Sequence, residues 1–262
     1  MLDDVQQASR DQFEKQSDLY GKLHILADTG DVAAALEELS FSPGATALDV
    51  ATGGGHTAVH LAGRGLKVIA ADISPAMLEN ARKLAAERGF DLETCLHEAE
   101  KFPYPDASFE LVTCRVAAHH FSDREAFLDE AFRVLKPGGY FLLIDGSVPD
   151  DEPEAEEWIH QVEKFRDPSH GRFLSPKTWA RMCLDRGLQV LRCETSPFKQ
   201  PDLEWYFHTA ATTPENRQKV YDLLRSVPES ARRVFALSNE DGKTIWWWLR
   251  LTLLARKKIA ND

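Results

Sequence analysis

The stretch Ala47-Leu48-Asp49-Val50-Ala51-Thr52-Gly53-Gly54-Gly55-His56-Thr57-Ala58 decides the fold of this 262-residue chain. An apolar strand runs into a glycine-rich turn, and a helix begins directly after the turn. Glycine lets a ligand approach bare backbone, because it has no side chain in the way. The helix presents unpaired N–H groups and the positive end of its dipole to that ligand. The stretch therefore predicts a ligand site between a strand and a helix.

Two acidic residues indicate which ligand this is. Asp72 ends a second predicted strand, about 20 residues after the glycines, where a carboxylate typically binds ribose hydroxyls. The spacing Gly53-x-Gly55-x-x-Ala58 also fits a dinucleotide, but a carboxylate at Asp49 would repel a pyrophosphate. Asp49 suits an amino-acid ammonium group, directly or through water. S-adenosylmethionine joins a ribose to such a cationic group, so we expect this cofactor in preference to NAD.

Strand and helix patterns alternate along the chain, which predicts parallel pairing with right-handed crossovers and hence a doubly wound α/β sheet. We expect strands at 45–50, 67–72, 92–97, 109–115, 140–145, 188–194 and 244–255. We expect helices at 32–39, 56–63, 75–88, 124–134, 154–165, 176–186, 203–211 and 214–226. Asp31 and Ser74 are predicted helix caps, Pro75 a first helical residue and Gly89 a helix stop. Asp241-Gly242 predicts a hairpin.

Blocks of sequence in a fixed order carry a family resemblance. They are Leu48–Gly55, Ala71–Leu78, Ala99–Asp106, Ala118–Phe121 and Arg133–Gly139. In order and spacing, over about residues 45 to 146, they resemble the class I S-adenosylmethionine-dependent methyltransferases. They are most similar to the ubiquinone/menaquinone-biosynthesis group. The resemblance implies a seven-stranded, Rossmann-like, mostly parallel sheet whose last strand is antiparallel.

We expect one domain over residues 1–262. The resemblance implies that residues 1–30, which include Tyr20, fold over the cofactor as a lid, although a frayed leader would have the same polar composition. The less regular segments at 150–175 and 200–235 read as cap insertions above the sheet.

The resemblance also assigns cofactor contacts. The loop residues Ala51, Thr52, Gly53 and Gly55 would hold the amino-acid end, together with Asp49. Asp72 would accept both ribose hydroxyls. Ile73 and Met77 would flank the adenine, although Met77 could equally belong to the core between helix and sheet. Tyr20 is a further candidate for cofactor contact. Glu98 stands where the family commonly has aspartate to bind the adenine amino group, Ala99 would offer its N–H, and Arg115 its backbone carbonyl.

His119 and His120 follow the fourth predicted strand, at the edge of the sheet that faces the ligand. A histidine there, with an ordinary pKa near ~6.5, can take a proton at neutral pH. We expect His120 ahead of His119, which could point into the packing; alternatively the pair only shapes the loop. Arg166 and His170 could line a substrate pocket or belong to a surface turn. Trp205, Tyr206 and Trp246–Trp248 could wall a pocket for a flat substrate or fill the core.

The amino-acid composition limits the kinds of partner and compartment that we expect for this protein. A net charge of −11 argues against a nucleic-acid footprint, which needs clustered Lys and Arg. The four cysteines form no Cys-x-x-Cys pair, so we expect buried thiols, no metal site and a reducing cytoplasm. We expect no signal peptide and no membrane insertion. The oligomeric state is left open.

The expected activity is methyl transfer to carbon or oxygen of a small, aromatic or otherwise apolar molecule. One alternative is a catalytically silent protein that binds S-adenosylmethionine. The other is an NAD-dependent oxidoreductase, which the absence of a Tyr-x-x-x-Lys pair disfavours.

Overall fold

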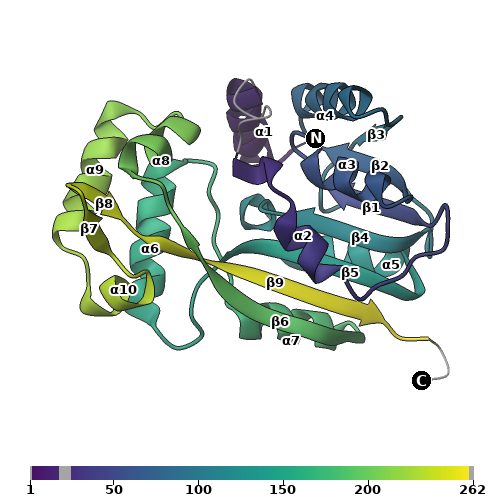
Figure 1. Ribbon diagram of the computed structural model, residues 1–262. Helices are drawn as coiled ribbons and strands as arrows, with labels where there is room; N and C mark the ends of the chain where they lie inside the picture. Colours follow the sequence, from purple (N-terminus) through teal and green to yellow (C-terminus); the bar gives the residue numbers. More distant parts are fainter. Residues whose placement is uncertain (1, 18–24, 260–262) are drawn as a thin grey trace.

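The computed structural model describes residues 2–17 and 25–259, so Tyr20 lies outside the described residues. A seven-stranded sheet with the order β3-β2-β1-β4-β5-β9-β6 forms the centre of the molecule (Figure 1). The strands are β1 (Thr46–Val50), β2 (Lys67–Asp72), β3 (Glu93–Leu96), β4 (Phe109–Arg115), β5 (Leu135–Ser147), β6 (Leu188–Lys199) and β9 (Trp247–Lys257). β9 pairs antiparallel with both β5 and β6, and β1 to β5 pair in parallel. The expected mostly parallel α/β sheet with an antiparallel last strand is confirmed.

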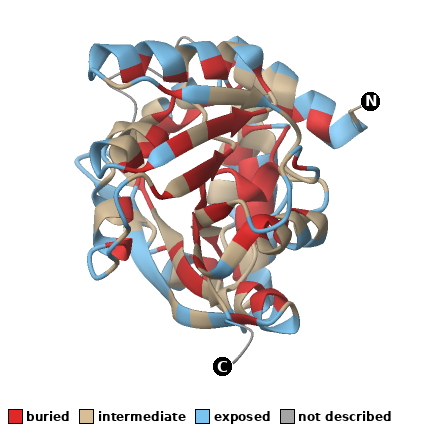
Figure 2. Ribbon diagram, turned by 90° about the vertical axis from the view of Figure 1, so that its right-hand side faces the viewer, coloured by how far each residue is buried: buried red, intermediate tan, exposed pale blue. Residues whose placement is uncertain are grey.

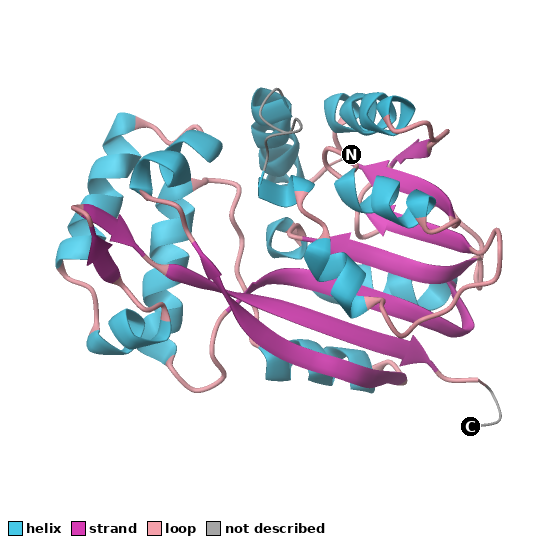
Figure 3. Ribbon diagram, in the orientation of Figure 1, coloured by secondary structure: helices cyan, strands magenta, loops and turns pink. Residues whose placement is uncertain are grey.

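Helices cover both faces of this sheet (Figure 3). The helices α2 (Gly30–Ala35), α3 (His56–Gly63) and α4 (Pro75–Glu87) pack on one face, and α5 (Arg124–Val134) and α7 (Pro176–Asp185) on the other. Because both faces are covered, the strand residues Ala47 and Leu48 are equally buried although they point in opposite directions. Figure 2 shows buried residues along the strands and exposed residues on the outer sides of the helices.

The start and end of α4 follow the sequence prediction. Ser74 caps the helix, because its Oγ accepts a hydrogen bond from the Met77 N–H at 3.3 Å, and Pro75 is the first helical residue. Gly89 follows the helix with φ +79°, a conformation that glycine adopts without steric cost.

The predicted cap at Asp31 was wrong. Thr29 precedes α2, and Asp31 lies inside its first turn. The Asp31 carboxylate instead pairs with Arg115 at 3.0 Å and Arg250 at 3.2 Å. Both arginines are remote in sequence, so local helix signals could not identify them.

A second group of elements extends the molecule beyond the sheet, and we call it the cap (Figure 1). It comprises α6 (Pro153–Arg166), α8 (Leu203–Thr209), α9 (Pro214–Arg225), α10 (Glu229–Val234) and the hairpin β7 (Ser238–Glu240) with β8 (Lys243–Ile245). The cap has its own apolar cluster, which includes Ile159, Phe207, Phe235 and Trp246. The hairpin predicted from Asp241-Gly242 is present.

Helix α1 (Asp4–Gln16) connects the sheet to the cap. Asp3 and Gln6 form a capping box at its start. Its side chains reach both parts: Ser9 Oγ donates to His120 O at 3.5 Å, and Gln12 Nε2 donates to Ala210 O at 3.0 Å. The described residues 2–17 are therefore packed across the carboxyl end of the sheet.

Candidate active site

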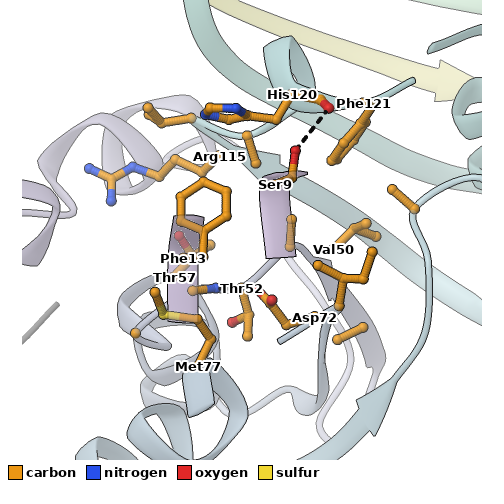
Figure 4. A pocket seen from close by; sticks show the side chains of 18 of the residues that line it. Ser9, Phe13, Val50, Thr52, Thr57, Asp72, Met77, Arg115, His120 and Phe121 are labelled. Atoms are coloured by element: carbon orange, nitrogen blue, oxygen red, sulfur yellow. Dashed lines mark hydrogen bonds between the residues drawn. The ribbon is translucent and has the colours of Figure 1, made fainter. Parts of the chain in front are cut away.

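A first cavity lies at the carboxyl ends of β1, β2 and β4 and contains about 900 Å³ of empty space. These strands are neighbours in a parallel sheet, so their ends and following loops converge there. In Figure 4, Asp72 and Met77 lie at one end of the cavity and His120 at the other. Of the predicted site residues, the wall contains Ala51, Thr52, Gly53, Asp72, Ile73, Met77, Ala99, Arg115 and His120.

Asp72 holds the glycine-rich loop against β2. Its Oδ2 accepts a hydrogen bond from the Gly53 N–H at 2.9 Å, and its Oδ1 accepts one from the Ser74 N–H at 2.9 Å. Burial raises the pKa of Asp72 to about 6, and these N–H groups oppose the rise. Each carboxylate oxygen keeps a second lone pair for a ligand hydroxyl.

Asp49 does not line the cavity. It is buried beneath the loop, where it accepts hydrogen bonds from Thr52 Oγ1 at 2.6 Å and Thr113 Oγ1 at 2.7 Å. Burial raises the pKa of Asp49 to about 6, although both hydroxyls lower it. Its carboxylate therefore acts on the cavity through Thr52.

Gly55 is placed by helix packing, away from the cavity wall. It has φ +83°, and a Cβ at this position would lie 2.7 Å from the Cα and Cβ of Ala81 in α4. Only a residue without a side chain allows α3 and α4 to approach so closely. The expected direct contact between Gly55 and a ligand is not what the geometry provides.

Replacement of Gly55 by alanine should lower the free energy of unfolding by about 3 kcal/mol, because overpacking adds to backbone strain. The matched control is Gly65→Ala, since Gly65 has φ +85° but no atom within 4 Å of the added Cβ. The control should lose only about 1 kcal/mol. Urea unfolding of both variants measures the difference, and equal losses would show that the Ala81 contact is unimportant.

The structure does not bring Glu98 to the cavity wall, whereas its neighbours His97, Ala99 and Glu100 line it. Glu100 is one of the wall residues that the sequence did not single out. Its carboxylate accepts hydrogen bonds from Gln6 Nε2 at 2.9 Å and from Ser122 Oγ at 2.9 Å. Glu100 therefore ties α1 to the loop after β4.

The Arg115 side chain anchors the segment before α2. Its guanidinium donates to Leu26 O at 2.8 Å and to Asp28 O, and it pairs with Asp31 at 3.0 Å. The side chain is 5% exposed, so this charge is fully committed to the protein. Only the Arg115 backbone remains for the predicted ligand contact.

A second cavity, with about 820 Å³ of empty space, lies between the sheet and the cap. It shares the wall residues Phe13, Leu26, Val116 and His120 with the first cavity. Val116 has φ +54°, a strained conformation for a β-branched residue. Such strain is concentrated at functional sites.

Aromatic and charged side chains from the cap and from β9 line the second cavity. Trp205, Trp248 and Arg166 belong to this wall, whereas Tyr206 and Trp246 are buried in the cap. Trp205 and Trp248 therefore face a cavity, whereas Tyr206 and Trp246 fill the core of the cap. His170 is also buried, with its ring centroid 5.4 Å from that of His119.

Glu163 forms the floor of this cavity and is 1% exposed. Its Oε1 accepts hydrogen bonds from Tyr206 Oη at 2.8 Å and Trp248 Nε1 at 2.7 Å, and its Oε2 accepts one from Arg166 Nη1 at 3.2 Å. Burial raises the pKa of Glu163 despite these three donors. The Arg166 guanidinium also lies over the rings of Tyr206 and Trp248.

His119 and His120 lie in a short 3-10 helix, Ala118–His120, with ring centroids 4.1 Å apart. His119 lines only the second cavity, and its Nδ1 lies 2.6 Å from Asp145 Oδ1. Burial and the neighbouring His120 hold the pKa of His119 well below its ordinary value. Burial also raises the pKa of Asp145 to about 7. His120 lines both cavities.

Within residues 2–17 and 25–259, no group of three His, Cys, Asp or Glu side chains could hold a metal ion. In the same residues, no helix is long and apolar enough to cross a membrane. All four cysteines are free.

The fold and the loop define an α/β protein that binds a nucleoside-type ligand at the carboxyl ends of its strands. Residues 48–143 match the family model described as a methyltransferase domain. YcgJ of Bacillus subtilis, an uncharacterized methyltransferase, is 31% identical over 245 residues, which cover 92% of this chain and 96% of YcgJ. A crystal structure of a Bacillus halodurans protein described as a methyltransferase superposes with TM-score 0.81 and 32% identity, covering 87% of this chain and 99% of that chain.

The chain therefore belongs to the class I S-adenosylmethionine-dependent methyltransferases, and its cofactor is S-adenosylmethionine. This excludes the NAD-dependent alternative. The expected closeness to quinone methyltransferases holds only in part. A demethylmenaquinone methyltransferase of Deinococcus radiodurans is 40% identical over 119 residues, which cover 45% of this chain and 49% of that protein.

Proposed function

We propose that the protein methylates carbon or oxygen of a small aromatic or otherwise apolar molecule bound in the second cavity. The observation that carries this proposal is the wall shared by the two cavities, which includes His120 and the strained Val116. Methyl transfer requires the acceptor and the cofactor in line, with water excluded. Two adjoining cavities of this size can hold the cofactor and the acceptor side by side.

The first cavity suits S-adenosylmethionine, which supplies an electrophilic methyl group on a sulfonium. Asp72 would accept the ribose hydroxyls, and the loop from Ala51 to Gly53 would receive the amino-acid end. Ile73 and Met77 offer apolar surface to the adenine, and Ala99 its backbone N–H. These roles are supported by the position of each residue on the cavity wall.

The second cavity suits an acceptor with an aromatic body. Trp205 and Trp248 offer ring faces and edges, while Glu163 and Arg166 are paired with each other. Because the charges of Glu163 and Arg166 neutralise each other, a strongly charged acceptor would gain little electrostatic attraction in this cavity. The same proposal includes two further roles. Residues 1–30 act as a lid over the cofactor, and the cap is the part of this single domain that binds the acceptor.

The direct test is a screen in which the protein is incubated with radiolabelled S-adenosylmethionine and a small-molecule extract of cells. A labelled small molecule that depends on the protein supports the proposal. S-adenosylmethionine binding without any labelled product would support the silent binding protein instead.

We expect His120→Gln to lower the rate of methyl transfer about 100-fold, the lower range for loss of a general base. The affinity for S-adenosylhomocysteine should stay within threefold of the wild type. His119→Gln is the comparison, because His119 does not reach the first cavity. A larger loss in His119→Gln than in His120→Gln would reverse the order of the two candidates.

Cofactor affinity should depend on pH through Asp72. Burial raises the pKa of Asp72 to about 6, so below that pH the carboxyl is protonated and loses acceptor capacity. Binding of S-adenosylhomocysteine, measured by calorimetry from pH 5 to 8, should be constant above pH 7 and weaken below pH 6. Asp72→Asn should flatten this dependence; an unchanged profile in the variant would assign it to another group.

A further inference from the structure

The turn after α6 packs against His120 from the side of the cap. In this turn Asp167 Oδ1 accepts hydrogen bonds from the Ser169 hydroxyl at 2.6 Å and from the Ser169 N–H at 2.9 Å. Asp167, Ser169 and His120 are all buried, with 6%, 4% and 8% of their surfaces exposed. The three residues therefore form a hydrogen-bonded chain shielded from solvent.

This chain determines which nitrogen of His120 carries the proton. His120 Nδ1 lies 3.1 Å from Ser169 O and 3.2 Å from Ser169 Oγ. The carbonyl oxygen can only accept, and the single hydroxyl hydrogen of Ser169 is directed to Asp167. Both neighbours of Nδ1 are therefore acceptors, so Nδ1 must carry hydrogen. In the neutral ring, Nε2 then has the free lone pair.

The His120 ring is positioned so that the lone pair of Nε2 can accept a proton from a bound ligand. The ring lines both cavities, and its Nε2 makes no hydrogen bond to any residue in the described part of the chain. The Phe13 ring from α1 packs against it with centroids 5.0 Å apart. Asp167 supplies a negative charge to the same chain. Burial alone would raise the pKa of Asp167, but His120, the Ser169 hydrogen bonds and Arg166 lower it overall.

Building on the proposed function, we propose that Asp167 and Ser169 are positioning residues that fix His120 as a proton acceptor, and that the methyl acceptor presents a phenolic or enolic hydroxyl to Nε2. His120 Nε2 takes the hydroxyl proton. A bond forms from the acceptor to the methyl carbon as the carbon–sulfur bond breaks, and sulfur keeps the electron pair. The imidazolium, stabilised by the Asp167 carboxylate through Ser169, later releases the proton to solvent. Charge and atoms balance without a further reactant.

The test is a long-range ¹H–¹⁵N spectrum of protein labelled at its nine histidines and saturated with S-adenosylhomocysteine. The His120 signals are assigned by their loss in His120→Gln. We expect the tautomer with hydrogen on Nδ1 and a free Nε2 at pH 7.5. Hydrogen on Nε2, or a charged ring, would overturn the proposal. This measurement needs no acceptor, so it stands apart from any failure of the labelled screen.

Two variants at Asp167 test the positioning role. Asp167→Ala frees the Ser169 hydroxyl to donate to Nδ1, so we expect both tautomers of His120. Asp167→Asn can keep an oxygen facing Ser169 and should retain the wild-type tautomer. Asp145→Asn is the matched control, which should change the signals of His119 and leave the His120 tautomer unaltered. If the His120 tautomer is unchanged in Asp167→Ala while cofactor binding is intact, Asp167 has no part in positioning His120.

The acceptor class is tested by the products of the labelled screen. Methyl ethers of phenols, or products methylated at or beside an enolic hydroxyl, are expected. A labelled amine, thioether or carboxyl ester would contradict the acceptor class. Once an acceptor is identified, Asp167→Asn should lower the rate of methyl transfer about tenfold. Asp167→Ala should lower it more, so the conservative variant would partly restore the rate.

Discussion

Asp72→Ala should lower the affinity for S-adenosylhomocysteine about a thousandfold. The carboxylate is placed to accept two ribose hydroxyls, and hydrogen bonds to a charged acceptor contribute about 1.5–3 kcal/mol each. A total near 4 kcal/mol corresponds to about three orders of magnitude in Kd. The same side chain holds the Gly53 and Ser74 N–H groups, so its loss also loosens the loop that receives the cofactor. Isothermal calorimetry measures the effect.

Glu98→Ala is the matched control for this measurement. Glu98 follows the next strand but does not line the cavity, so its removal should change Kd less than threefold. A large loss in Glu98→Ala would mean that this side chain turns into the cavity when the cofactor binds. A loss of less than tenfold in Asp72→Ala, with the variant folded, would contradict the ribose-binding role.

The first cavity was largely predictable because its parts are local in sequence. The turn from Ala51 to Gly53 follows its strand directly, and Asp72 ends the neighbouring strand. A glycine-rich turn and a strand-end carboxylate each have one preferred place in a doubly wound sheet. Gly55 shows the limit of this reasoning. The glycine was visible, but whether it faces a ligand or Ala81 depends on how two helices pack.

The second cavity could be predicted only in part. Arg166, Trp205 and Trp248 were candidate wall residues and do line it, but which of the candidates come together could not be foreseen, because the walls come from segments far apart in the sequence. Trp248 in β9 and Glu163 in α6 are separated by 85 residues, and the folded chain brings them within hydrogen-bonding distance. The sequence singled out Arg166 and His170 in the turn after α6. Arg166 does line the second cavity. In the same turn, however, Ser169 contacts His120, 49 residues earlier, and Asp167 accepts a hydrogen bond from Ser169. No periodicity encodes such a contact.

Glu163→Ala should lower the free energy of unfolding by about 4 kcal/mol, the middle of the range for breaking a buried ion pair. Glu163 is 1% exposed and accepts hydrogen bonds from Arg166, Tyr206 and Trp248, which belong to α6, α8 and β9. Its removal leaves the half-buried Arg166 guanidinium, the Tyr206 hydroxyl and the Trp248 indole N–H without this acceptor. Glu163→Gln, which keeps one oxygen, should lose less. Urea unfolding gives the free energies.

Glu157→Ala on the same helix is the matched control, because Glu157 has a 58% exposed side chain and should have no measurable effect. The part of the molecule that loses stability in Glu163→Ala is as informative as the change in the free energy of unfolding. The cap has its own apolar cluster, so Glu163→Ala should increase amide hydrogen exchange in α6 and α8 before it does so in β1 and β4. The wall of the second cavity would then open while the first cavity still binds S-adenosylhomocysteine. Equal stability of Glu163→Ala and Glu157→Ala would show that the buried charges of the cap do not hold this wall together.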